Sequence, residues 1–187
     1  MSVDSSWNLR RLVASTFPLL VVLSALEMGS GVILEGLRDS YLNNPSLLVL
    51  VPVMIGMGGN LGSMLSSRLS TRLHLGTTRL DPRDPVVASN IVAVFGLALT
   101  VFVLLGFSTY GLGRTVIQGS LSLATVLTVS VLSGTVLASV VVVVSLVATY
   151  LAYVTGVDPD DVVIPVVTNV CDILGVVILT AVVILVV

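Results

Sequence analysis

The chain has 187 residues, of which 56% are hydrophobic and only 10% are charged, and its mean hydropathy is +1.14. Because soluble domains carry about 25% charged residues, this composition indicates an integral membrane protein and excludes an ordinary soluble one. The formal net charge is −2 and basic residues are few, so nucleic acid is not an expected partner. The single cysteine excludes an intrachain disulfide.

Five long apolar stretches follow one another along the chain, and a helix needs about 20 such residues to cross a bilayer. Only helices and closed barrels satisfy their backbone in lipid, and these runs do not alternate, so we expect an all-α membrane bundle. We expect breaks in the second stretch, at Pro52 and at the glycines that include Gly58 and Gly59. The expected spans are 12–37, 46–73, 86–107, 121–153 and 162–187.

The first stretch follows Arg10 and Arg11 and is too long for the apolar part of a secretion signal, so we interpret it as a retained span. Only about eleven residues precede it. We therefore expect a single transmembrane domain over residues 1–187, with no soluble regulatory domain.

The arginines predict the orientation, because positive charge in short loops stays cytoplasmic. Six lie at the N-terminus and around the second connection, and two lie on the opposite side. We expect a multi-pass protein of the cell (plasma) membrane with its N-terminus inside and its C-terminus outside. The six are Arg10, Arg11, Arg68, Arg72, Arg79 and Arg83, and the two are Arg38 and Arg114.

The last stretch contains an acid, Asp172, which costs at least about 2.5 kcal/mol inside a membrane and usually marks a functional path. Pro165 leaves the carbonyl of Asp161 without its helical donor, so we expect a helix break there. Thr168 and Asn169 share a helix face with Asp172. Carboxylate and carbonyl oxygens suit a hard cation, and Mg²⁺ is usually held by one or two carboxylates. The structural alternative is that Asp172 pairs with an arginine or hydrogen-bonds another helix.

Other polar residues in the stretches are weaker candidates. Glu27 and Glu35 lie on one face of the first stretch without a compensating base in that span, which fits a cation approach or a proton-coupled step. Glu35 is close enough to the end of the stretch to be a solvated end residue. Asn60 follows two glycines, for which close helix packing is the favoured interpretation, with ligand donation as the alternative. The same two interpretations hold for Asn90.

The sequence predicts no enzyme. There is no lysine and hence no phosphate-binding loop of the glycine–lysine type. A nucleophile-elbow pattern is absent, and one aspartate in the last stretch without a second in a similar setting argues against an aspartate-dyad protease. An odd number of spans prevents two equal halves in one subunit, so a two-fold homodimer is the expected way to enclose a pore.

Two motifs with the right order and separation resemble those of MgtE-type magnesium channels, especially their eukaryotic solute-carrier branch. One resembles the second membrane helix of the family and the other its last helix. They are PVMIGMGGNLG at 52–62 with RLST at 68–71, and GVDP at 156–159 with Pro165, Thr168 and DILG at 172–175. The resemblance extends over nearly the whole chain, from about Arg11 to its end.

This resemblance implies a five-helix subunit that dimerises around a central ion pathway. It implies that Asp172 binds a largely hydrated Mg²⁺, the transported ion, and that the carbonyl of Thr168 faces it. Family members often carry asparagine before the proline of the last helix, whereas this chain has Ile164. Bacterial relatives carry cytoplasmic magnesium-sensing domains, for which we expect no room here. Eukaryotic relatives fuse two five-helix units, so this chain is expected to pair with itself or with a similar second subunit.

The sequence is compatible with three functions. The first is a dimeric divalent-cation channel or transporter, most simply for Mg²⁺, with Asp172 as central ligand. The second is Na⁺- or H⁺-coupled Mg²⁺ exchange that uses Glu27 or Glu35. The third is a non-conducting membrane subunit that needs a partner chain.

Overall fold

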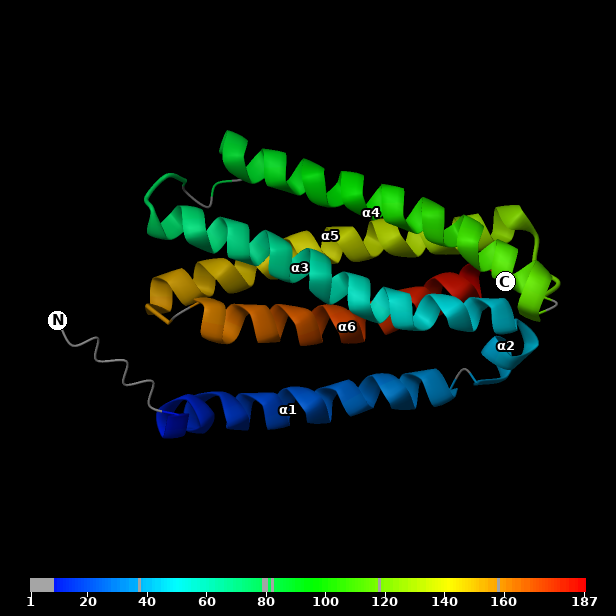
Figure 1. Cartoon of the computed structure of the whole chain (residues 1–187), viewed down its shortest axis with the longest axis horizontal. Coiled ribbons are helices and arrows are strands. Elements are labelled where there is room, and N and C mark those ends of the chain that lie inside the picture. The colour runs from blue at the N-terminus through cyan, green and yellow to red at the C-terminus, as the bar shows by residue number, and fades with distance from the viewer. Residues whose placement is uncertain (1–8, 37, 79–80, 82, 118, 158) are drawn as a thin grey trace.

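The computed structural model describes residues 9–36, 38–78, 81, 83–117, 119–157 and 159–187. In these ranges the chain is helical with short connections and contains no strand, which confirms the predicted all-α class. Five helices in this part are long and apolar enough to cross a membrane (Figure 1). They are α1 (Leu9–Gly36), α3 (Leu50–His74), α4 (Pro85–Leu112), α5 (Leu123–Thr155) and α6 (Pro159–Val186).

The helix ends follow from local capping chemistry. Asp84 precedes α4, and its Oδ1 accepts a hydrogen bond of 2.8 Å from the amide of Val86. Ser122 caps α5 in the same way, with the amide of Thr125 at 3.1 Å. Gly156 ends α5 in the left-handed conformation, at a φ of 68°, which glycine adopts without steric cost. The expected turn before the fifth span is therefore present.

Two connections differ from the sequence expectation. The predicted polar turn after the first span contains a short helix, α2 (Arg38–Asn43), and a 3₁₀ segment, η1 (Pro45–Val49). The third span was expected to end at residue 107, but α4 continues to Leu112 and is followed by a π-helical turn, η2 (Gly113–Ile117). Tyr110 and Arg114 contribute to this extension, because the guanidinium lies 5.3 Å from the ring centre.

The expected helix breaks are wrong, because α3 continues through Pro52, Gly58 and Gly59, and α6 continues through Pro165. Pro52 is the third residue of α3, where the backbone amide has no intrahelical acceptor to lose. Pro165 removes a single bond in α6, and the surrounding helices can hold a membrane helix together across such a gap. Gly58 and Gly59 are covered by α6.

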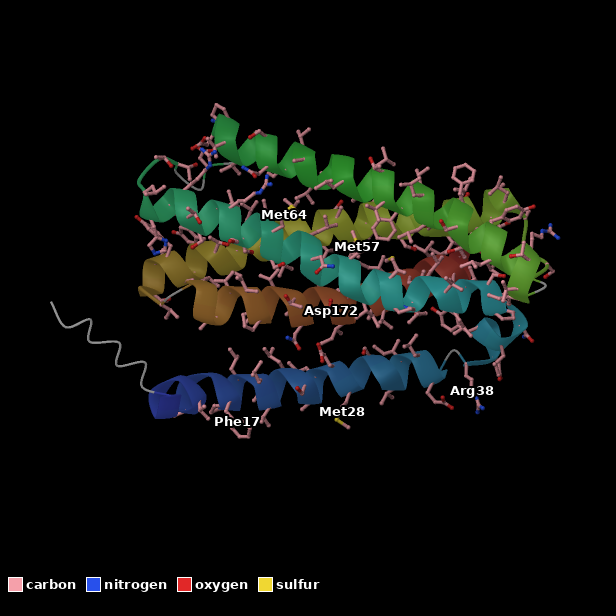
Figure 2. All side chains as sticks on the ribbon, in the orientation of Figure 1. Phe17, Met28, Arg38, Met57, Met64 and Asp172 are labelled. Atoms are coloured by element: carbon pink, nitrogen blue, oxygen red, sulfur yellow. The ribbon has the colours of Figure 1, made fainter. Side chains whose placement is uncertain are left out.

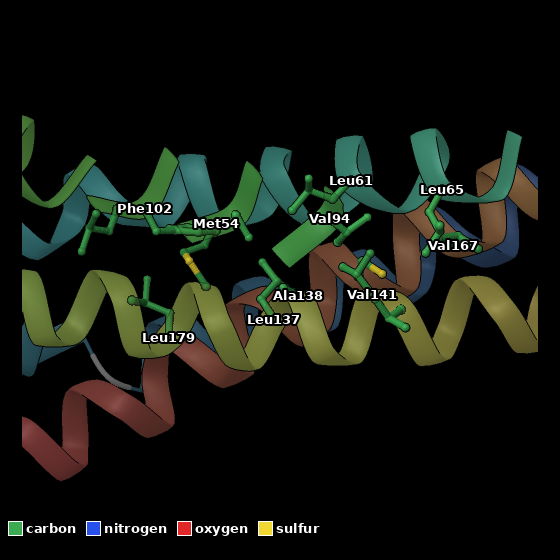
Figure 3. Close-up of a cluster of buried hydrophobic side chains, with 14 of the residues drawn as sticks. Met54, Leu61, Leu65, Val94, Phe102, Leu137, Ala138, Val141, Val167 and Leu179 are labelled. Carbon is green, nitrogen blue, oxygen red and sulfur yellow. The ribbon is translucent and has the colours of Figure 1, made fainter. Parts of the chain in front are cut away.

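The long helices run along a common axis, with α3, α5 and α6 packed on one another (Figure 1). Helix α4 packs mainly on α5, and α1 packs mainly on α6 at the opposite edge. The buried core lies where α3, α4, α5 and α6 meet (Figure 3). Its side chains include Met54, Leu61, Leu65, Phe102, Leu137, Val141, Val167 and Leu179.

The two ends of the bundle carry different connections. The start of α1, the α3–α4 connection and the α5–α6 turn lie at one end, and α2, η2 and the C-terminus lie at the other (Figure 1). Arg68 and Arg72, in the last turns of α3, therefore lie at the end opposite Arg38 and Arg114. Arg79 lies outside the described residues. Which of the two ends faces the cytoplasm stays a prediction.

Candidate functional site

Helices α3 and α6 approach each other closely because glycines lie on both contact faces. A Cβ added to Gly58 would lie 3.0 Å from the carbonyl oxygen of Cys171. On α6, a Cβ added to Gly175 would lie 3.0 Å from the carbonyl oxygen of Met54. Small residues at such crossings let the backbones of membrane helices pack directly. The structure thus agrees with the packing interpretation of the glycine segment.

Asp172 lies at this crossing, about midway along the bundle (Figure 2). Its Oδ1 would be 3.1 Å from a Cβ on Gly59, and the methyl carbon of Thr168 would be 2.7 Å from the same point. The Asp172 side chain is half-buried, and Oδ1 itself is fully buried without a hydrogen-bond partner among the described residues. Of the two structural alternatives, pairing with an arginine is not observed in this part of the chain. For the other, a hydrogen bond to a second helix, the group on hand is the backbone of Gly59 on α3, which acts on the carboxylate without meeting the geometric criteria for a hydrogen bond to Oδ1.

Glu27 of α1 is the acidic neighbour of Asp172. Helix α1 packs on α6, Glu27 is half-buried, and its negative charge is close enough to act on the carboxylate of Asp172. A cation near these two acids would be attracted by both negative charges. The sequence contained both residues but no pattern that would have paired them.

Glu35 differs from Glu27. Its side chain is exposed and lies near the end of α1, with one carboxylate oxygen 3.7 Å from the guanidinium of Arg38. Both residues line an open pocket of about 280 Å³ between α1, α2 and the start of α3. Glu35 therefore has the surroundings of a solvated end residue, the structural alternative that its position suggested.

The three candidate amides have different surroundings. Asn169, on the face of Thr168 and Asp172, donates a hydrogen bond of 2.8 Å from Nδ2 to the carbonyl of Pro165. Asn60 follows Gly59 on α3 and is exposed. Asn90 lies in the second turn of α4 and bonds to the carbonyl of its own helix one turn earlier, at 2.8 Å. The structure thus brings Thr168, Asn169 and Glu27 to the region of Asp172, while Asn90 and Glu35 lie elsewhere.

No cluster of three or more histidine, cysteine or acidic side chains that could hold a metal ion exists among the described residues. A site at Asp172 would therefore consist of few protein ligands, with water or a second chain supplying the rest. Mg²⁺ tolerates such a site because it keeps several of its waters. The sequence reasoning missed the contribution of Gly59, whose missing side chain makes room for the carboxylate.

Five membrane-length helices with an ionisable site between them define a multi-pass membrane protein, and such intramembrane acids are typical of ion-transport proteins. The model of the MgtE family, described as a divalent cation transporter, matches residues 51–182. The chain belongs to this family. The match runs from the second residue of α3 into the last turns of α6, and it includes both motifs from which the resemblance was inferred.

The chain is also similar to vertebrate proteins named solute carrier family 41 member 2. It is 28% identical to the Xenopus laevis protein over an alignment of 169 positions, and the alignment covers 81% of this chain and 28% of the relative. For the Gallus gallus protein the identity is 27%, over 89% of this chain and 31% of the relative. For the Mus musculus protein it is 26%, over 95% and 33% respectively. The chain thus spans a third or less of the length of these relatives.

Proposed function

We propose that this chain forms a pathway for divalent cations, with Mg²⁺ as the transported ion and Asp172 as the central acidic ligand. The observation that carries the proposal is the buried, unpaired Oδ1 of Asp172 at mid-depth in a member of a divalent cation transporter family. An unpaired carboxylate oxygen inside a membrane protein is costly unless something binds it. A hydrated cation fulfils this role while it passes.

The neighbouring groups suit a largely hydrated ion. Thr168 lies one turn before Asp172, and the carboxamide oxygen of Asn169 is an acceptor, because the bond to Pro165 uses only the nitrogen. Oxygen groups of this kind can hold the waters of Mg²⁺ without replacing them. Gly59 keeps the space beside Asp172 free of a side chain.

We further propose that two such subunits form the pore around a two-fold axis, either two copies of this chain or one copy and a similar five-helix subunit. One face of α3 beside Asp172 remains open in the single chain. It presents Pro52, Gly56, Asn60 and Met64, which are all exposed and recur at intervals of one helical turn. A partner on this face would bring two copies of Asp172 to one pathway, which supplies the charge that a divalent ion needs.

A cysteine cross-link tests this arrangement. In a Cys171→Ser background, Asn60→Cys is expected to form a disulfide-linked dimer under mild oxidation, because equivalent residues meet only near a two-fold axis. Disulfide formation requires Cβ atoms within about 4.5 Å. The control is Val143→Cys on the exposed face of α5. A denaturing gel is expected to show a dimer band for Asn60→Cys alone. Equal bands for both variants, or none for either, would contradict a two-fold axis between two copies of this chain at this face.

Coupled exchange is the second candidate, because Glu27 acts electrostatically on Asp172. A proton or Na⁺ on one carboxylate would alter the affinity of the other for Mg²⁺. Glu35, paired with Arg38 at the helix end, is not supported in this role. We expect Glu27→Gln to change the dependence of Mg²⁺ flux on a pH or Na⁺ gradient, and Glu35→Gln to leave it unchanged. Gradient dependence that is the same in wild type and Glu27→Gln would remove Glu27 from the mechanism.

The proposed setting is the plasma membrane, with the N-terminus inside, on the basis of the six-to-two division of arginines. The remaining alternative is a subunit that conducts only with a partner chain. Purified protein that moves no ion until a second chain is added would favour it. Reconstitution of the purified chain alone therefore has to come before any mutant is interpreted.

A further inference from the structure

A polar pocket lies between the last turns of α3 and the first turns of α4, at the end of the bundle opposite α2. Its volume is about 300 Å³. It is lined by Ser67, Arg68, Thr71, Arg72 and Asn90. The two basic side chains come from α3, one turn apart, and the amide comes from the facing helix. This pocket is separate from the Asp172 crossing, which is formed by α3 and α6.

The two guanidinium groups of this pocket have no acidic partner in the described part of the chain. Arg68 and Arg72 lie at i and i+4 on one helix face, where like charges repel each other. The described acids nearest to them along the chain, Asp81 and Asp84, form hydrogen bonds within the α3–α4 connection and at the start of α4. Asp81 accepts a bond of 2.8 Å from the amide of Arg83, and Asp84 caps α4. Two adjacent, exposed arginines that have no ion pair among the described side chains are a binding feature for an anion.

The other lining residues of the pocket are uncharged, so they do not neutralise the positive charge of the two arginines. The hydroxyl of Thr71 donates to the carbonyl of Ser67 at 2.9 Å, and the amide nitrogen of Asn90 bonds within α4. These bonds hold the side chains of Thr71 and Asn90 in place. The N–H groups of the two guanidiniums are then the donors that can bind a ligand in the pocket. Guanidinium groups bind phosphate oxygens in a bidentate manner, which a single ammonium cannot do.

The position of the pocket indicates where its ligand comes from. Helix α3 ends at His74 and α4 begins at Pro85, so the pocket opens at the level where the helices leave the apolar layer. Arg68 and Arg72 also belong to the set that the orientation prediction assigns to the cytoplasmic side. Anionic lipids are concentrated in that leaflet, and basic pockets between membrane helices bind their headgroups.

We propose that this pocket binds a phosphate group at the membrane surface, either in the headgroup of an anionic phospholipid or as a free phosphate ion. The binding fixes the ends of α3 and α4 relative to each other. The proposal does not depend on the function proposed for Asp172, because neither the ligand nor the residues are shared.

Lipid binding can be measured by native mass spectrometry of the full chain released from nanodiscs. One set contains phosphatidylcholine alone and the other contains added phosphatidylglycerol, and inorganic phosphate is the competitor in a third arm. Wild type is expected to retain phosphatidylglycerol. The double variant Arg68→Gln/Arg72→Gln is expected to lose about 25-fold in affinity, which is about fivefold for each arginine. Displacement by millimolar phosphate would identify the free ion as a ligand.

The matched control is Arg38→Gln/Arg114→Gln, which removes the same charge from the opposite end and is expected to bind like wild type. Asp172→Asn is expected to bind like wild type too, so a failure of the transport proposal would leave this result intact. Size-exclusion profiles check that each variant is folded. Equal retention of lipid and equal response to phosphate in wild type and Arg68→Gln/Arg72→Gln would overturn the proposal.

Discussion

Replacement of Asp172 with asparagine is expected to abolish Mg²⁺ flux into liposomes that contain the purified chain. The amide keeps the size of the side chain but removes the charge that holds a divalent ion. Loss of residues that only support a metal ligand costs about 10- to 100-fold, so loss of the ligand itself is expected to reduce flux by more than about 100-fold. A Mg²⁺-sensitive dye inside the liposomes reports the initial rate.

The matched control for this experiment is Asp39→Asn, which removes an exposed carboxylate of α2 outside the membrane spans. Its flux is expected to equal that of wild type. Equal flux in wild type and Asp172→Asn would show that Asp172 is not the central ligand, whatever the state of the other residues.

Gly59→Ala is expected to produce the second large effect, through packing rather than charge. The added Cβ would lie 2.7 Å from the methyl carbon of Thr168 and 3.1 Å from Oδ1 of Asp172, so these two side chains must shift or α3 and α6 must separate. Overpacking of this kind costs about 1–3 kcal/mol. We expect a lower thermal unfolding midpoint in detergent and a flux reduced at least tenfold, because the carboxylate is displaced.

The control for this substitution is Gly56→Ala in the same helix. A Cβ at Gly56 would meet no atom within 4 Å, and alanine is a better helix former than glycine by about 1 kcal/mol. Its thermal midpoint is expected to equal or exceed that of wild type in the isolated chain. If Gly56→Ala and Gly59→Ala unfold at the same temperature, the close crossing at Gly59 is not a determinant of stability.

The five spans could be predicted from the sequence because lipid leaves few alternatives for long apolar runs. The continuation of α3 and α6 through their glycines and prolines could not be predicted, because it depends on the neighbouring helices. Pro165 lies in a helix that α3 and α5 support, and Gly58 and Gly59 pack against α6. Intrinsic propensity favours a break at each of these positions, and tertiary packing overrides it.

The candidate site was only partly predictable. The cost of an acid in a membrane helix was enough to make Asp172 the first candidate, and helical spacing was enough to place Thr168 and Asn169 on its face of the helix. The approach of Glu27 could not be predicted, because it depends on α1 packing against α6 and not against another helix. For the same reason, helical spacing alone could not separate Glu27 from Glu35, which lie on one face of the same helix.

Direct binding of a paramagnetic divalent ion tests the central claim, that Asp172 residues of two subunits hold one ion. Mn²⁺ also accepts oxygen ligands, and its bound fraction can be counted by electron paramagnetic resonance in the purified protein. We expect one tightly bound Mn²⁺ per two chains, which Mg²⁺ displaces and which is absent in Asp172→Asn. Tight binding that is unchanged in Asp172→Asn, or one ion for every single chain, would contradict this claim.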